Sequence, residues 1–355
     1  MVLVHFLRRL LFVSIFMLLT ISSVQIILAQ ETKEPLHIDL SKTLGFVMGQ
    51  RLSLNRIKVE YPTLSTRVQK VDLEFKSAFE IAEKNIEKAL RDILKEKYSE
   101  YLAAMKNKIK STIITQKIDQ KIAEQFLDEI ESRTNGVMPS PILETLLNYQ
   151  FEDNPVDEFN RGFKKKYETK GHPKAKGLDL QIEYPKSWSM REGNRPNVIQ
   201  FFSSNNGRGP VDVMIMTRDI IKESQGKLSH EEITTINTRE GSKGFASELF
   251  SESNIREMVN GMSVTNVRDI TTKRIVLDGW PGAMIEFIGD QQRLDITIMM
   301  YNRLYVAVYK NYVIYLHCVI GKLPDDSEDS LKNKISMFAP LFHKIANSLV
   351  IQSQY

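Results

Sequence analysis

The stretch LDLQIEYP, from Leu178 to Pro185, has an apolar side chain at every second position and a proline at its end. Successive side chains of a strand point to opposite faces, so this alternation predicts a β-strand with one buried face. Before it, from about residue 41 to residue 167, nearly every segment has helical periodicity, whereas later segments alternate as strands do. The sequence therefore predicts an α+β protein, with a helical domain at residues 31–167 and a sheet domain at residues 178–355.

The helical half contains a long apolar stripe whose members are spaced three and four residues apart, from Leu64 to Ile113. If unbroken, such a stripe would form one helix of about 75 Å. Further helices are predicted at residues 117–133 and 142–147. Antiparallel packing as a helical hairpin or bundle would bury these stripes within one chain, and pairing with a second copy as in a coiled coil would bury them in a dimer. Heptad spacing alone does not decide between the two.

A shorter helix is expected at the start of this half, with Ser41 as its N-cap. Gly45 and Gly49 are four residues apart and so share one face of that helix. Because neither has a side chain, we expect another helix to approach this face closely.

The second half contains further strand candidates and two helices. The strands are predicted at Val198–Phe202, Val211–Thr217, Val264–Leu277, Ala283–Ile288, Leu294–Val308 and Tyr312–Val319, and the helices at Glu248–Asn260 and Leu331–Asn347. Strands in hairpin order with few helices imply an antiparallel sheet with helices packed on it.

Residues 168–177 separate the two halves and combine two glycines, a proline and three lysines, which predicts a basic linker. The cations of the wider run, residues 161–176, favour a solvated hinge. Contact with anionic lipid or an acidic partner is the alternative. The sequence Gly241-Ser242-Lys243-Gly244 is interpreted as a flexible turn.

Residues 1–30 carry Arg8 and Arg9, no acid, and an uncharged run from Leu10 to Ala29. A basic start followed by an apolar run is typical of a secretory signal peptide. The run is also long enough to remain as an N-terminal membrane anchor. Both interpretations predict an exported protein, periplasmic or anchored in the inner membrane and facing the periplasm.

Composition excludes several classes of protein and of site. The formal net charge is +4, from 48 Lys and Arg against 44 Asp and Glu, which is no nucleic-acid footprint. A single cysteine, Cys318, excludes an intrachain disulfide and a cysteine-based zinc cluster. Its apolar neighbours predict a buried core residue. The six histidines lack metal-ligand spacing, so no metal and no cofactor is expected.

Three features of the second half together resemble the PsbP-like superfamily, which includes extrinsic photosystem subunits and exported bacterial relatives. They are YPKSW at 184–188, LDGWPGA at 277–283 with long hairpins after it, and a closing helix that ends IANSL at 345–349. The resemblance covers residues 175–352 and implies an α/β/α sandwich, an antiparallel sheet with helices on both faces. It also implies a non-enzymatic assembly or binding role, and the family has no universal catalytic set to carry over. The attached helical domain departs from the plant pattern.

The phrase LGFVMG at 44–49, ahead of a long helix, is similar to the N-terminal dimerisation region of exported FKBP-type prolyl isomerases. The isomerase domain has no counterpart here. This similarity implies a dimeric, chaperone-like arm.

Aromatic side chains are the candidate binding residues of the sheet domain: Trp188, Trp280, Tyr301, Tyr305 and Tyr309. The three tyrosines share one face of a regular strand, with Arg303 among them. Such a face either receives covering helices or lines a ligand groove.

No catalytic constellation is recognisable, so we expect a non-enzymatic binding or assembly factor of the bacterial envelope. Its partner would be another envelope protein, with a homodimer through the helical domain as a further expectation. One alternative is a small-ligand or lipid-binding module with a pocket near Trp188 and Trp280. Another is a hydrolase whose nucleophile and base lie adjacent only in the fold.

Overall fold

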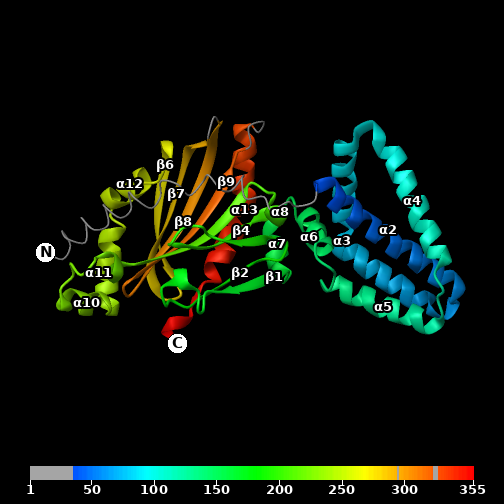
Figure 1. Cartoon of the computed structure of the whole chain (residues 1–355), viewed down its shortest axis with the longest axis horizontal. Helices are drawn as coiled ribbons and strands as arrows, with labels where there is room; N and C mark the ends of the chain where they lie inside the picture. Colours follow the sequence, from blue (N-terminus) through cyan, green and yellow to red (C-terminus); the bar gives the residue numbers. More distant parts are fainter. Residues whose placement is uncertain (1–34, 294–295, 323–326) are drawn as a thin grey trace. The chain divides into compact units, whose positions relative to one another are not determined.

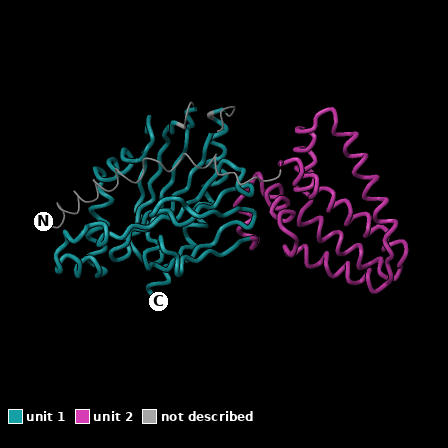
Figure 2. Tube along the Cα trace, viewed as in Figure 1, with its two compact units in different colours: residues 1–30, 164–355 teal, residues 31–163 magenta. Residues whose placement is uncertain are grey.

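The chain divides into two compact units, a helical unit that ends at Phe163 and a sheet unit that begins at Lys164 (Figure 2). The computed structural model describes residues 35–293, 296–322 and 327–355 (Figure 1). The predicted signal peptide or anchor, residues 1–30, lies outside these ranges. No helix within them is long and apolar enough to cross a membrane. The α+β class, helices first and antiparallel sheets after, is confirmed.

The helical unit is built from six α-helices and two 3₁₀ turns within its described residues. These are α2 (Leu36–Glu60), η1 (Pro62–Leu64), α3 (Ser65–Leu94), η2 (Lys95–Lys97), α4 (Tyr98–Thr115), α5 (Gln120–Thr134), α6 (Ile142–Gln150) and α7 (Pro155–Asn160). The apolar stripe of α3, which runs from Val68 to Leu90, is buried and packs against α2, α5 and α6. The stripe therefore forms the core of this unit within one chain.

Helix α4 packs on the glycine face of α2, as the Gly45 and Gly49 spacing predicts. A Cβ added at Gly45 would lie 3.7 Å from Met105 Sδ, and one added at Gly49 would lie 3.6 Å from Ile109 Cγ2. These are ordinary van der Waals separations. The two helices thus meet with little side-chain volume between them on the α2 side.

Two details of the helical unit differ from the sequence expectations. Helix α2 begins at Leu36 after Pro35, so Ser41 lies inside the helix, and its Oγ donates to the His37 carbonyl at 2.6 Å instead of capping the start. The long stripe does not form one helix, because the 3₁₀ turn η2 interrupts the helix at Lys95, whose φ is +51°. The break lets α4 turn away from α3 and pack on α2.

The sheet unit contains two antiparallel sheets. The smaller has the order β1-β2-β10 and the larger the order β3-β4-β5-β9-β8-β7-β6. The strands are β1 (Lys164–Glu168), β2 (Leu180–Pro185), β3 (Ser189–Glu192), β4 (Val198–Ser203), β5 (Val211–Asp219), β6 (Thr265–Leu277), β7 (Trp280–Arg293), β8 (Ile296–Tyr309), β9 (Tyr312–Gly321) and β10 (Val350–Ile351).

Helices cover both faces of the larger sheet, on opposite sides of its long strands (Figure 1). The helices and 3₁₀ turns of the sheet unit are α8 (Ser204–Gly207), α9 (Ile220–Glu223), α10 (His230–Ile236), α11 (Arg239–Leu249), α12 (Glu252–Asn260), α13 (Glu328–Asn347), η3 (Pro173–Ala175) and η4 (Gln352–Gln354). On one face Phe245 and Leu249 of α11 share a core with Leu304 and Val306 of β8. On the other face α13 packs on β8, β9 and β2. The alternation along β8 therefore assigns even-numbered residues to α11 and odd-numbered ones to α13.

The hairpin between β6 and β7 depends on the sequence Asp278-Gly279. Leu277 pairs with Trp280, and both turn residues have positive φ, +46° and +81°. Asp-Gly is favoured in two-residue hairpin turns because both positions need φ above zero. The Asp278 carboxylate also accepts a hydrogen bond of 2.7 Å from the Ile351 backbone N–H, so the turn holds the C-terminal strand β10.

The predicted basic linker, residues 168–177, belongs to the sheet unit, because local hydrogen bonds and burial hold it there. The Thr169 hydroxyl donates to the Leu178 carbonyl at 2.8 Å, and Ala175 is buried. Two of the linker's three lysines pair with acids of the sheet unit: Lys174 with Glu192 at 2.7 Å, and Lys176 with Glu223 at 3.3 Å. The boundary between the units therefore lies before β1 rather than after it.

Residues 241–244, interpreted above as a flexible turn, lie inside α11. The Thr238 side chain accepts from the Gly241 backbone N–H at 3.0 Å and so caps the helix start. Helix propensity is low for glycine, and here the cap and the burial of Phe245 and Leu249 outweigh it.

Replacing Gly45 by alanine is expected to stabilise the helical unit by about 1 kcal/mol, because alanine has the higher helix propensity and its Cβ finds ordinary contact distances. Replacing Gly282 by alanine is expected to destabilise the sheet unit by about 1–3 kcal/mol, because its Cβ would lie 2.4 Å from the Val306 carbonyl oxygen. Urea unfolding followed by circular dichroism measures both. Equal effects of the two changes would contradict the packing described.

Candidate functional site

The five aromatic side chains predicted as binding residues are all buried. Tyr301, Tyr305 and Tyr309 occupy odd positions of β8, on the face covered by α13, as the strand periodicity predicts. Trp280 begins β7, and Trp188 lies in the connection between β2 and β3. This aromatic face is therefore covered by other elements of the sheet unit, α13 among them.

Trp280 and Tyr309 form one cluster with the C-terminal residues. Their ring centroids are 4.8 Å apart at an interplanar angle of 88°, an edge-to-face contact. Trp280 Nε1 donates to Gln354 Oε1 at 2.7 Å, and the Tyr309 hydroxyl donates to the Ser353 carbonyl at 3.0 Å. Each of the two side chains is thus hydrogen-bonded to the 3₁₀ turn η4.

Trp188 packs elsewhere along α13. Its ring centroid is 6.4 Å from that of Phe338, which in turn lies 6.2 Å from Phe342 on the same helix. Trp188 therefore packs against α13, whereas Trp280 packs against Tyr309, and the two tryptophans belong to separate clusters.

Tyr301 and Tyr305 belong to a hydrogen-bonded network centred on Arg303. Arg303 Nη2 donates to Glu286 Oε1 at 2.7 Å, and Arg303 Nε donates to the Tyr301 hydroxyl at 2.8 Å. The Tyr301 hydroxyl in turn donates to Glu286. The Tyr305 hydroxyl lies 3.0 Å from His343 Nδ1, within hydrogen-bond distance.

The network also ties the sheet to α13 through the backbone. Arg303 Nη1 donates to the Ala339 carbonyl at 3.1 Å, one residue before Pro340, which lies inside the helix. Proline interrupts the helical hydrogen bonds and commonly kinks a helix. Arg303 therefore binds α13 directly beside its internal proline.

Electrostatics keep this network ionised and its tyrosines neutral. Burial opposes the charge of Glu286, but the hydrogen bonds from Tyr301 and Arg303 outweigh burial and lower the pKa of Glu286. Burial, followed by the hydrogen bond to Glu286, raises the pKa of Tyr301. Burial, followed by the charge of Arg303, lowers the pKa of His343. A neutral His343 faces Arg303 without repulsion.

Sequence reasoning missed Glu286 and His343 as members of this cluster. The signal for Glu286 was indirect: Arg303 lies between two tyrosines on a buried strand face and needs an acid nearby, and Glu286 is its cross-strand partner. His343 has no sequence signal, because its place depends on how α13 lies across β8.

A second buried polar pair lies on the opposite face of the same strands. His317 Nε2 of β9 lies 3.0 Å from Asn302 Oδ1 of β8. Burial lowers the pKa of His317 to about 4, so its ring is neutral near pH 7. The neighbouring Cys318 is fully buried, as predicted, and burial raises the pKa of its thiol, which makes it unreactive.

The chemistry that this arrangement supports is structural. Across the described ranges no three His, Cys, Asp or Glu side chains gather as metal ligands. The groups around Arg303 satisfy one another and hold α13 on the sheet, and the aromatic face is filled by side chains. Binding of a ligand on this face would require α13 or η4 to move.

No protein family profile and no curated protein matches the chain. Among solved structures, one match is the crystal structure of LpqN from Mycobacterium tuberculosis, described as involved in cell envelope biogenesis. It has 9% sequence identity, covers 56% of this chain and 96% of LpqN, and has a TM-score of 0.28. A TM-score this low does not establish a shared fold.

Replacing Glu286 by glutamine is expected to destabilise the sheet unit by about 2 kcal/mol at pH 7, because Arg303, 7% exposed, loses its counter-charge. This value is below the cost for a fully buried pair because Glu286 is 23% exposed. Adding Arg303→Met should recover part of the loss, and urea unfolding of the single and double variants measures the coupling. Additive losses would contradict the pairing.

Protonation of His317 is expected to weaken folding as the pH falls from 6.5 towards 4. Its folded-state pKa of about 4 lies below the ordinary value of 6.5, so only the unfolded chain binds the proton in this window. Between pH 7 and pH 5 the wild type should lose about 2 kcal/mol more than His317→Gln. The glutamine variant is the control, because every other group titrates in both proteins. Identical pH dependence of urea unfolding would refute a buried neutral His317.

Proposed function

We propose that the chain is an exported, non-enzymatic binding or assembly factor of the bacterial envelope, which binds a protein partner through its helical unit. The observation that carries this proposal is the incomplete burial of the apolar stripe of α4. Over its 18 residues only Tyr98 and Ile113 are buried, and Leu102, Met105 and Ile109 of the same stripe are half-buried. An amphipathic helix whose apolar stripe is only partly covered by its own chain is suited to bind another surface.

Exposed apolar side chains concentrate in the same unit. Twelve large apolar residues of the described ranges are exposed, and eight of them belong to the helical unit: Val59, Leu73, Ile81, Ile93, Tyr101, Ile114, Ile122 and Val137. Single exposed apolar residues are ordinary, but their concentration on the smaller unit favours a protein-binding role there.

The sheet unit is proposed to act as the PsbP-like scaffold of the molecule. Its sandwich of helices on both faces of an antiparallel sheet agrees with what that resemblance implies. Export is proposed from the basic and apolar pattern of residues 1–30. The small-ligand alternative would need space near Trp188 and Trp280, and both rings are packed against neighbouring side chains.

A photoreactive residue in place of Ile114, which is 62% exposed on α4, is expected to give a covalent adduct in cells that express the protein. The matched control is the same residue in place of Val276, which is 67% exposed on β6. Mass spectrometry of the adduct identifies the partner, and an adduct of twice 40.9 kDa would identify a second copy of this chain. Equal adduct yields at both positions would contradict the proposal.

A further inference from the structure

Three helix ends meet at one end of the helical unit: the last turns of α2 and α4 and the first turn of α5 (Figure 1). We refer to residues 56–61 and 110–122 as the three-helix end. Arg56 of α2 donates to the carbonyl of Ile113 and, at 2.8 Å, to that of Gln116. The hydroxyl of Tyr61 donates to the Ile118 carbonyl at 2.8 Å. The connection between α4 and α5 is thus fixed to the end of α2.

The three-helix end carries exposed apolar side chains, one from each helix. Val59 of α2 is 79% exposed, Ile114 of α4 is 62% exposed and Ile122 of α5 is 45% exposed. These branched side chains belong to three different elements. They therefore form separate protrusions and not the continuous apolar stripe by which one helix receives another.

Four exposed lysines lie beside these apolar side chains in the sequence, and within the described residues they form no ion pair: Lys58, Lys110, Lys117 and Lys121. The neighbouring acids are engaged within the helical unit. Glu60 pairs with Arg56 at 2.6 Å, the Asp119 side chain caps α5, and Glu124 accepts from the Gln120 side chain at 3.0 Å. The three-helix end therefore keeps a net positive charge around its apolar protrusions.

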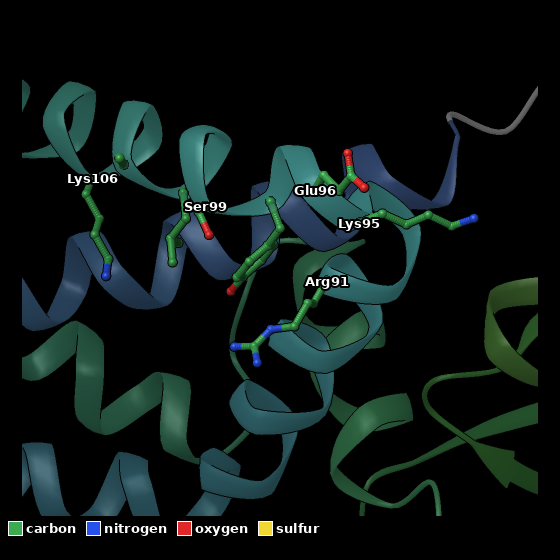
Figure 3. A pocket seen from close by; sticks show the side chains of 8 residues that line it. Arg91, Lys95, Glu96, Ser99 and Lys106 are labelled. Carbon is green, nitrogen blue, oxygen red and sulfur yellow. The ribbon is translucent and has the colours of Figure 1, made fainter.

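The opposite end of α4 also gathers cations, but they share no common surface. A pocket of about 590 Å³ lies there, and Arg91, Tyr98 and Lys106 are among its lining residues. Arg91 and Lys106 extend to one side, whereas the ends of Lys95 and Glu96 turn away from them (Figure 3). We therefore assign no ligand to this pocket.

We propose that the three-helix end binds the surface of an anionic membrane. Apolar side chains at such a surface are buried at the boundary between headgroups and acyl chains, and nearby lysines are attracted to the anionic headgroups. A fluid surface needs no matching pockets, so it suits protrusions from separate elements. The net positive charge favours anionic lipid over zwitterionic lipid.

This inference goes beyond the protein partner proposed above. The protein contact is assigned to the length of α4, whereas the membrane contact is assigned to the end of the helical unit.

Labelling at a new cysteine tests the contact directly, because the single natural cysteine, Cys318, is buried. Ile122→Cys carries an environment-sensitive fluorophore at the three-helix end, and Val276→Cys, on β6, is the matched control. The purified full chain is mixed with vesicles of phosphatidylglycerol in phosphatidylcholine, or of phosphatidylcholine alone. The emission of the label at position 122 should shift to shorter wavelength with the anionic vesicles only. The label at position 276 should not respond.

The readout is local to the label, so vesicle binding by another segment of the chain does not produce it. Replacing both Lys117 and Lys121 by glutamine in the labelled protein is expected to raise the lipid concentration at half-maximal shift about 25-fold, since each lysine near an anionic surface contributes about fivefold. Lys227→Gln together with Lys273→Gln is the matched control, because it removes the same charge from exposed positions of the sheet unit. The control pair should leave the half-maximal lipid concentration unchanged.

The apolar contribution is measured by Val59→Ser, which is expected to raise the half-maximal lipid concentration about fivefold. Its matched control is Val276→Ser, the same change at a position that is 67% exposed on β6. The control should bind the vesicles as the labelled parent does.

The proposal is overturned if the label at position 122 does not respond to anionic vesicles, if it responds equally to both kinds of vesicle, or if the lysine pair and its control lose binding equally. A shift without lipid that grows with protein concentration would assign the surface to a second copy of this chain instead. Ile114 is unchanged in all these variants, so the cross-linking experiment can be repeated in them. Loss of vesicle binding with the protein adduct retained separates this proposal from the proposed function.

Discussion

A buried arginine on an interior strand must find its counter-charge inside the protein, and Arg303 finds it in Glu286 on the neighbouring strand. The pair constrains its surroundings. The Tyr301 hydroxyl also donates to the carboxylate, and Arg303 Nη1 reaches the Ala339 carbonyl of α13. Because an ion pair of this kind is costly when one partner is lost, β7, β8 and α13 have to pack in this one arrangement. The layer order of the sheet unit therefore depends on a polar contact as well as on its apolar core.

The packing of the helical unit depends on two other features, the close approach of α4 to α2 and the interruption of the helix at Lys95. The small side of α2 at Gly45 and Gly49 admits α4, and the turn at Lys95 reverses the chain so that α4 can reach that side. The same turn leaves Arg91, Tyr98 and Lys106 around one pocket. A single backbone feature thus accounts for the packing of α4, for its half-covered stripe and for the collected positive charge.

The two units differ in how far their conspicuous side chains are packed and hydrogen-bonded within the chain. In the sheet unit the conspicuous aromatic and charged side chains satisfy one another, so its polar chemistry stabilises the fold. In the helical unit the apolar stripe of α4 is only partly covered by the rest of its chain. Groups that folding leaves unsatisfied are the ones available to bind something else. This contrast is why the proposed function concerns the helical unit, although the aromatic residues had drawn attention to the sheet unit.

The sequence by itself determined the elements whose periodicity is strong: the α3 stripe, the alternating strands, the closing helix and the shared face of Tyr301, Tyr305 and Tyr309. It also determined that Cys318 is buried, because its neighbours are apolar. Only the tertiary structure decided where the long stripe breaks, since one residue in a strained conformation carries no periodic signal. That residues 168–177 belong to the sheet unit depended on ion pairs with Glu192 and Glu223, and that residues 241–244 are helical depended on the burial of Phe245 and Leu249. The same holds for the pairing of Arg303 with Glu286 and for the pocket of Arg91, Tyr98 and Lys106, because periodicity reports which face a residue occupies, and not which neighbour the fold brings to that face.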